Sequence, residues 1–265
     1  MLFFLLLNFS HNILAQNIIA VDSLSIASTK ISIYRDSIKI GVATGFVVKK
    51  GEKYFLITNK HVVTGLNPFD GSPVLKDSLI PNALIVSHHH NSLSFWSNFK
   101  YPLYDSLNTP VWIEHLSNSL IDVIAIPTRT INEHDYFTID YDNAESNVHI
   151  GPSELVNIIG YPSGISSTGG NGIMGIWKSG HIASEPDFDI NGDPYFYIDA
   201  TTSGGMSGSP VVYKSILYHI SKKNEIVMND KSFSIFLGVY SSQYLKESLG
   251  IVWKPKVIKE ILENE

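Results

Sequence analysis

The chain has 265 residues, of which 44% are hydrophobic, and carries a formal net charge of -6. A chain of this length and composition can bury one large core or two small cores packed together, so we expect a folded globular protein. The negative net charge provides no basic field for phosphate backbones, which argues against nucleic acid as a partner. The absence of cysteine excludes a thiol nucleophile, a thiolate metal site and disulfide bonds.

The longest apolar run lies at the N-terminus, from Met1 to Phe9, and is too short to span a bilayer. Polar residues follow it and lead to Ala15, a small residue of the kind found at signal-peptide cleavage sites. No Lys or Arg precedes the run, which departs from the usual signal-peptide pattern, and a buried N-terminal strand is the alternative. We predict a signal peptide over residues 1–15 and a secreted or periplasmic mature chain with no membrane partner.

After residue 20 the sequence consists of short β-type runs separated by turn residues, which predicts a sandwich or barrel. Residues 66–110 carry only weak strand patterns and are predicted to hold long loops. The candidate strands of the first half are Lys30–Tyr34, Thr44–Lys49, Tyr54–Asn59, Ala83–Ser87, Val111–Glu114 and Ile121–Ile126. Those of the second half are Leu155–Gly160, Gly175–Ala183, Tyr195–Asp199, Pro210–Tyr213 and Ser234–Tyr240, with a helix over Lys254–Leu262.

A glycine-rich turn surrounds Ser207 in the segment Gly204–Pro210, which leads into a predicted strand. A serine hydroxyl is an effective nucleophile only when it is exposed beside a base, with N–H groups aimed at the position of the oxyanion. Glycines permit such a backbone, and the N–H groups of Gly205 and Ser207 are the natural donors. A hairpin turn without chemistry is the alternative explanation of the same residues.

Two further segments each contribute a residue that could complete such a site. His61 follows a predicted strand, so a rigid element would carry this base. Asp122 interrupts an apolar run, and a buried carboxylate needs a hydrogen-donating partner such as an imidazole. The alternatives are a hydrogen-bonded structural histidine and a solvent-facing edge-strand Asp. Asp77 or Asp105 could also take the place of Asp122.

The order His, Asp, Ser with these flanks resembles the chymotrypsin-like serine peptidases, especially their bacterial trypsin-like branch. The resemblance covers the chain from about residue 43 to the C-terminal helix. It implies two packed six-stranded antiparallel β-barrels, over residues 16–140 and 141–265, the second ending in a helix. The segments similar to the family are Ala43–Val48 before the histidine strand, Ile158–Pro162 and Ser179–Ile182 in the second barrel, and Leu237–Ser241 along the substrate.

The resemblance also implies a role for each matched position. Ser207 would attack the scissile carbonyl, His61 would take and return the proton, and Asp122 would fix the imidazole tautomer. The N–H groups of Gly205 and Ser207 would form the oxyanion hole. Ser241 would buttress the triad and begin the edge along which a polypeptide substrate adds as a strand. No cofactor and no metal are expected.

Several positions depart from the family pattern or bear on specificity. Met206 stands where animal members carry the Asp that pairs with a newly cut N-terminus, so we expect activity without cleavage beyond the signal peptide. Thr201 replaces the Asp of a trypsin pocket, and Tyr240 replaces the His of glutamyl endopeptidases. Gln243 would narrow the pocket mouth and favour small apolar side chains. The predicted substrate-binding residues are Thr201, Thr202, Tyr240, Ser241 and Gln243.

Three other motifs match known sites only in part. Gly170–Gly175 has the letters G-x-G-x-x-G, but no helix pattern follows it, so we predict a surface loop. Asp187–Gly192 begins like a calcium loop, but its twelfth position is Ile198, so a hairpin turning at Asn191-Gly192 is predicted. His88–His90 would point to alternating faces of a strand, so a solvated loop is predicted instead of a metal site.

The leading hypothesis is an exported serine endopeptidase that acts through an acyl-enzyme. The main alternative is a catalytically inactive member of the same fold kept as a binding module, although the complete triad argues against it. An esterase or lipase is the third possibility, but Ser207 lacks the Gly-x-Ser-x-Gly elbow of that class.

Overall fold

The structure is a computed structural model that describes residues 21–89, 96–128, 136–142, 147–169, 172–244 and 248–263. The side chains of residues 169, 243 and 244 lie outside the described part. The predicted signal peptide, residues 1–15, also lies outside it.

The first half of the chain forms one antiparallel sheet of seven strands in the order β5-β4-β1-β2-β3-β7-β6. The long strand β2 is its centre, and tight turns at Asp36 and Gly51, both with positive φ, join it to β1 and β3. The strands are β1 (Ser28–Arg35), β2 (Ile38–Lys50), β3 (Lys53–Thr58), β4 (Ala83–His89), β5 (Trp96–Pro102), β6 (Ile113–Glu114) and β7 (Ile124–Pro127).

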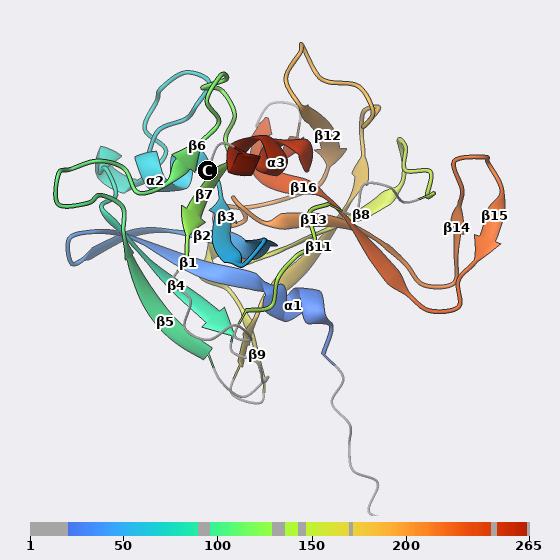
Figure 1. Ribbon diagram of the computed structural model, residues 1–265, viewed down its shortest axis with the longest axis horizontal. Coiled ribbons are helices and arrows are strands. Elements are labelled where there is room, and N and C mark those ends of the chain that lie inside the picture. Colours follow the sequence, from blue (N-terminus) through green and yellow to red (C-terminus); the bar gives the residue numbers. More distant parts are fainter. Residues whose placement is uncertain are drawn as a thin grey trace, which may run out of the picture.

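The second half forms a closed barrel of six strands in the order β11-β12-β17-β16-β13-β8. Two small ribbons, β9 with β10 and β14 with β15, stand away from this barrel (Figure 1). The barrel strands are β8 (Leu155–Gly160), β11 (Ile176–Ile182), β12 (Tyr195–Asp199), β13 (Pro210–Ser215), β16 (Phe233–Tyr244) and β17 (Leu249–Trp253). The ribbon strands are β9 (Ser167–Gly169), β10 (Gly172–Met174), β14 (Tyr218–Ile220) and β15 (Ile226–Met228).

Three short α-helices complete the described fold. Helix α1 (Ser23–Ala27) is capped by the Asp22 carboxylate, which accepts the N–H of Leu24, and α2 (Lys60–Thr64) follows β3. Helix α3 (Lys256–Glu263) buries its apolar side chains against β6 and β7 of the first sheet. Two 3₁₀ turns are η1 (Lys76–Ser78) and η2 (Pro162–Gly164).

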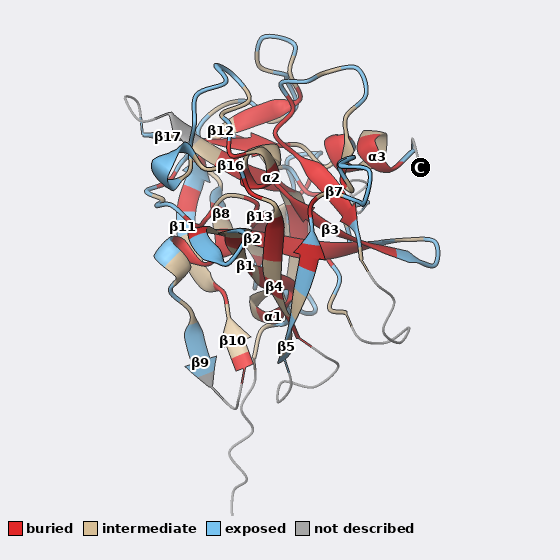
Figure 2. Ribbon diagram, turned by 90° about the vertical axis from the view of Figure 1, so that its left-hand side faces the viewer, coloured by how far each residue is buried: buried red, intermediate tan, exposed pale blue. Residues whose placement is uncertain are grey.

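The two halves share one hydrophobic core. The ring of Phe46 on β2 meets the ring of Phe236 on β16 edge-on, with centroids 5.3 Å apart. Trp253 at the end of β17 is fully buried in the same cluster as Phe55 and the apolar residues of α3. Figure 2 shows the buried residues concentrated on the central strands. The sheet and the barrel are therefore packed face to face.

The predicted all-β fold, with two packed antiparallel units and a C-terminal helix, is confirmed. The first unit differs from the predicted six-stranded barrel, because in the described residues it is a sheet of seven strands with β5 and β6 at its two edges. The additional strand is β5, which forms in the region predicted as loops and pairs along the whole of β4. The second unit closes through β17, which the sequence pattern did not show. The last strand of the sheet ends at Pro127 and the first strand of the barrel begins at Leu155, so the division near residue 140 remains a prediction.

The predicted loop at His88–His90 is wrong for the described residues. His88 and His89 lie in β4 and are buried, whereas His90 lies outside the described part. The His88 Nε2 atom lies 2.9 Å from the Tyr101 hydroxyl, and the His89 ring bonds the carbonyl of Ile173. Within the described residues, no group of three His, Cys, Asp or Glu side chains could hold a metal ion.

The hairpin turn predicted at Asn191-Gly192 is confirmed, because both residues have positive φ and Ile190 bridges Asp193 across them. The Asp189 carboxylate in this turn accepts hydrogen bonds of 2.7 Å from both Lys254 and Lys256. The surface loop predicted at Gly170–Gly175 is wrong for residues 172–174, which form β10 because they pair with β9 as a two-stranded ribbon. Residues 170 and 171 lie outside the described part.

Replacing Phe46 by Ala tests whether the shared core holds the two units together. We expect the free energy of unfolding to fall by about 3–5 kcal/mol, because a fully buried ring leaves a cavity. The matched change Phe188→Ala removes a ring that is 70% exposed and should alter stability by less than about 0.5 kcal/mol. Urea denaturation of both variants measures the difference, and equal losses would contradict the proposed core.

Candidate active site

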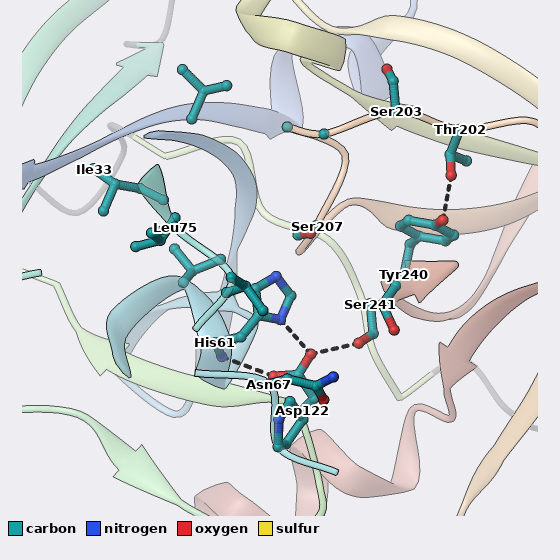
Figure 3. Close-up of a pocket in the computed structure, with 17 residues that line it drawn as sticks. Ile33, His61, Asn67, Leu75, Asp122, Thr202, Ser203, Ser207, Tyr240 and Ser241 are labelled. Carbon is teal, nitrogen blue, oxygen red and sulfur yellow. Dashed lines mark hydrogen bonds and ion pairs between the residues drawn. The ribbon is translucent and has the colours of Figure 1, made fainter. Parts of the chain in front are cut away.

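A cleft of about 460 Å³ lies between the sheet and the barrel. It brings together His61, Asp122 and Ser207, which are far apart in the sequence (Figure 3). The described residues that line it are Ile33, Val42, His61, Val62, Asn67, Pro68, Val74, Leu75, Asp122, Thr202, Ser203, Gly204, Gly205, Ser207, Tyr240, Ser241 and Ser242.

His61 is held by the helix that follows β3. Helix α2 begins at Lys60 and is capped at Gly65, whose left-handed conformation (φ 74°) lets its N–H donate to the His61 carbonyl. The His61 side chain is only 13% exposed, and one ring nitrogen, Nδ1, lies 2.6 Å from Asp122 Oδ2. The other ring nitrogen faces the side of the cleft where Ser207 lies (Figure 3).

Asp122 is fully buried, and its carboxylate is surrounded by donors. The main-chain N–H of His61 donates to Oδ1 at 2.9 Å, while His61 Nδ1 and the Ser241 hydroxyl bind Oδ2 at 2.6 and 2.5 Å. The Asn59 amide donates to the Asp122 carbonyl at 2.6 Å, which fixes the backbone as well. This hydrogen bonding compensates a buried charge that would otherwise be costly.

The two alternative carboxylates lie elsewhere. Asp77 is exposed in η1, and Asp105 is exposed in a loop where its side chain accepts the N–H groups of Leu107 and Thr109. Among these three aspartates, the structure therefore places only Asp122 against His61.

The turn that carries Ser207 needs glycine at two positions. Gly205 and Gly208 have φ values of +95° and +84°, in the region that favours glycine. A Cβ atom on Gly205 would lie 2.4 Å from the Tyr161 carbonyl oxygen, and one on Gly208 would lie 2.1 Å from that of Thr44. The glycines thus let the turn press against both units while the Ser207 side chain stays partly exposed.

Hydrogen bonds to carbonyl groups orient the peptides of this turn. The Gly204 carbonyl accepts from Ser163 N–H at 2.6 Å, and the Met206 carbonyl accepts from Ser209 N–H at 3.0 Å. In a trans peptide the N–H points opposite to the carbonyl, so the following N–H groups, of Gly205 and Ser207, point away from these partners. In the described part of the chain, no hydrogen bond uses either N–H as a donor. Both remain available to an oxyanion.

Thr44 of β2 connects the first unit to this turn. Its N–H donates to the Ser207 carbonyl and its hydroxyl donates to the Gly205 carbonyl, both at 2.8 Å. The hydroxyl also accepts from Tyr161 N–H at 3.0 Å, and the Thr44 carbonyl accepts from the Thr58 hydroxyl. One buried residue of the sheet therefore positions the backbone on both sides of Met206.

Met206 anchors the same turn from the barrel side. Its side chain is fully buried in the barrel core with Ile158, Phe196 and Tyr240. Apolar packing of Met206 thus fills the position at which the resemblance to the chymotrypsin-like peptidases implies an ion-paired Asp in animal members.

The residues predicted to bind substrate divide into three groups. Thr202, Tyr240 and Ser241 line the cleft, and the Thr202 hydroxyl is hydrogen-bonded to that of Tyr240 (Figure 3). Burial raises the pKa of Tyr240, so its hydroxyl stays neutral. Thr201 is exposed and is not one of the described residues lining the cleft. The side chain of Gln243 lies outside the described part.

Three residues that organise the site are not among those predicted from the sequence. Thr44 belonged to a recognised strand, but the partners of its hydroxyl, Gly205 and Tyr161, are more than 110 positions away. Asn59 lies two residues before His61 and is buried. The sequence indicated only that Asn59 ends a predicted strand, and it gave no sign of the contact with Asp122. Ser163 contributes only its backbone, so its side chain gave no indication.

Three solved structures with similar folds are described as proteases. A serine endoprotease from Yersinia pestis aligns with a TM-score of 0.51 and 15% identity over 93% of this chain and 67% of that chain. A protease from M. tuberculosis in its active form aligns with a TM-score of 0.45 and 18% identity over 91% and 81% of the two chains. The catalytically inactive tobacco etch virus protease, complexed with substrate, aligns with a TM-score of 0.47 and 15% identity over 88% of this chain and 79% of that chain.

A search of curated proteins found no significant match. Among the described residues, no helix has the length and apolar character needed to cross a membrane.

The family model described as the trypsin-like peptidase domain matches residues 43–215. This range covers more than half of the 265 residues and contains His61, Asp122 and Ser207. The chain belongs to the trypsin-like peptidase family and is a serine protease.

Proposed function

We propose that the chain is an endopeptidase that cleaves polypeptides through a covalent acyl-enzyme on Ser207, with His61 as the base and Asp122 as its partner. The observation that carries this proposal is the set of hydrogen bonds around Asp122, which holds the His61 ring in one orientation beside Ser207. A carboxylate on Nδ1 leaves the other ring nitrogen free to accept the serine proton.

In the proposed reaction, the Ser207 hydroxyl oxygen attacks the scissile carbonyl carbon while His61 takes its proton. The N–H groups of Gly205 and Ser207 bind the oxygen that becomes negative, and His61 then protonates the leaving nitrogen as the C–N bond breaks. In the second half-reaction His61 takes a proton from water, and the water oxygen attacks the acyl carbon. The ester bond to Ser207 then breaks, and His61 returns the proton to the Ser207 oxygen. Asp122 stabilises the imidazolium that forms in each half-reaction.

The side of the cleft that would hold the residue before the scissile bond is neutral. Thr202 and Tyr240 present paired hydroxyl groups, and no Lys, Arg or Glu is among the described residues that line the cleft. We propose that this residue is uncharged. We also propose export by the predicted signal peptide and activity without further cleavage, since Met206 is already packed in the barrel core.

Ser207→Ala tests the nucleophile. Without its oxygen no acyl-enzyme forms, so kcat should fall by roughly a millionfold and labelling by a fluorophosphonate probe should disappear. The control Ser117→Ala removes an exposed hydroxyl outside the cleft and should label like the wild type. Wild-type protein that is folded but unlabelled would instead support an inactive binding module.

Asp122→Asn tests the partner of the base. The amide cannot stabilise an imidazolium and favours the wrong tautomer, so kcat should fall about 10⁴-fold while the fold persists. Asp77→Asn changes the exposed alternative carboxylate and should keep wild-type activity. The kcat for hydrolysis of a peptide substrate is measured for both variants. Loss of activity in Asp77→Asn with wild-type activity in Asp122→Asn would identify Asp77, and not Asp122, as the partner of His61.

Thr44→Val tests how the sheet controls the oxyanion donors. Loss of the hydroxyl releases the Gly205 carbonyl and leaves the buried Tyr161 N–H unpaired, so kcat should fall about 10- to 100-fold with a smaller change in KM. Thr44→Ser keeps the hydroxyl and should restore most of the activity. Steady-state kinetics normalised by active-site titration measure both, and equal activity of Val and Ser variants would refute the role.

A further inference from the structure

The two walls of the cleft differ in chemical character. The barrel wall is polar and presents Thr202, Tyr240 and Ser241. The sheet wall is mostly apolar, with Asn67 as a polar side chain at its edge, and Figure 3 shows Ile33 and Leu75 on the opposite side of Ser207 from Tyr240. The apolar residues of the sheet wall are Ile33, Val42, Val62, Pro68, Val74 and Leu75. Ile33 and Val62 are buried beneath it, so the accessible apolar surface comes from the other four residues.

The position of His61 determines which part of a substrate contacts the sheet wall. This inference rests on the proposed function, in which His61 protonates the leaving group. When the C–N bond breaks, Ser207 Oγ keeps the acyl carbon and His61 gives its proton to the leaving nitrogen. That nitrogen must lie within hydrogen-bonding reach of His61, and the residue attached to it extends away from the acyl group. The sheet wall is the surface on this side of the cleft.

The sheet wall is fixed to the base by continuous backbone. Val62 is the next residue after His61 in α2, and the helix ends where Gly65 N–H donates to the His61 carbonyl at 2.9 Å. The following loop closes on itself, because Val74 N–H donates to the Gly65 carbonyl at 2.9 Å. The loop therefore delivers Leu75 to the cleft at a set position relative to His61.

Leu75 is half-buried and packs on the core of the first sheet. A Cβ atom on Gly41 would lie 3.0 Å from a terminal carbon of Leu75 and 3.2 Å from one of Ile33. The bare glycine backbone thus leaves room for both side chains to form one apolar surface. Because Val42 continues this surface towards Gly205, it reaches from the loop to the proposed oxyanion donors.

We propose that the sheet wall is a binding site for an aliphatic or aromatic side chain on the substrate residue immediately after the scissile bond. Such a side chain would leave water for an apolar surface. An acidic side chain there would find no Lys or Arg among the described lining residues, and a basic one would find only the Asp122 carboxylate, which is already bound by His61 and Ser241.

Paired internally quenched peptides test this proposal directly. The two peptides share one sequence and carry either Leu or Ser immediately after the scissile bond. We expect the wild-type kcat/KM to be about tenfold higher for the Leu peptide, the scale of discrimination by a hydrophobic pocket. Leu75→Ser should reduce this ratio to near one. Leu107→Ser removes a leucine that is 83% exposed and outside the cleft, and should keep the wild-type ratio.

Acyl transfer provides a second measurement that does not depend on a variant. Leucinamide and serinamide compete with water for the wild-type acyl-enzyme, and each transfer breaks the Ser207 ester, forms an amide bond and restores the hydroxyl. We expect leucinamide to capture the acyl group about tenfold more effectively. An acyl-enzyme that forms but shows no preference in either assay would overturn this proposal alone. Failure of any acyl-enzyme to form would overturn the proposed function.

Discussion

The buried carboxylate of Asp122 is the constraint on which the rest of the site depends. An isolated charge in a protein interior costs several kcal/mol, and this one is compensated by donors from two separate parts of the fold. His61 belongs to the helix after β3, whereas Ser241 lies on β16 of the barrel. Satisfying one carboxylate therefore fixes His61, Ser241 on β16 and the relation between the two units at once.

The turn that carries Ser207 has backbone carbonyl groups that are held by hydrogen bonds and, within the described residues, two N–H groups that are left without them. Its carbonyl groups are bound by Ser163, Ser209 and Thr44, so the peptides cannot rotate without losing hydrogen bonds. The N–H groups of Gly205 and Ser207 are therefore held in a fixed orientation before any substrate binds. Such preorganisation matters because donors that are already aligned need not reorganise as charge develops. Thr44 makes this alignment depend on the packing of the sheet against the barrel.

The same packing produces a cleft with two unlike walls. The barrel contributes neutral hydroxyl groups, and the sheet contributes the apolar surface around Leu75. Because Ser207 lies between these walls, the two sides of a scissile bond would meet different chemistry in the proposed reaction. The shared core around Phe46 and Phe236 therefore supports both the geometry of the site and the proposed selection of substrates.

Local sequence indicated the candidate catalytic residues and most of the strands. The glycines around Ser207, the strand before His61 and the apolar run around Asp122 were visible because each pattern reflects only neighbouring backbone. Tertiary structure alone decided that Asp122, and not Asp77 or Asp105, meets His61, that His88 is buried in a strand, and that Thr44 holds the Gly205 carbonyl. These outcomes depend on contacts between residues distant in the sequence, and such contacts exist only after the sheet and barrel have packed.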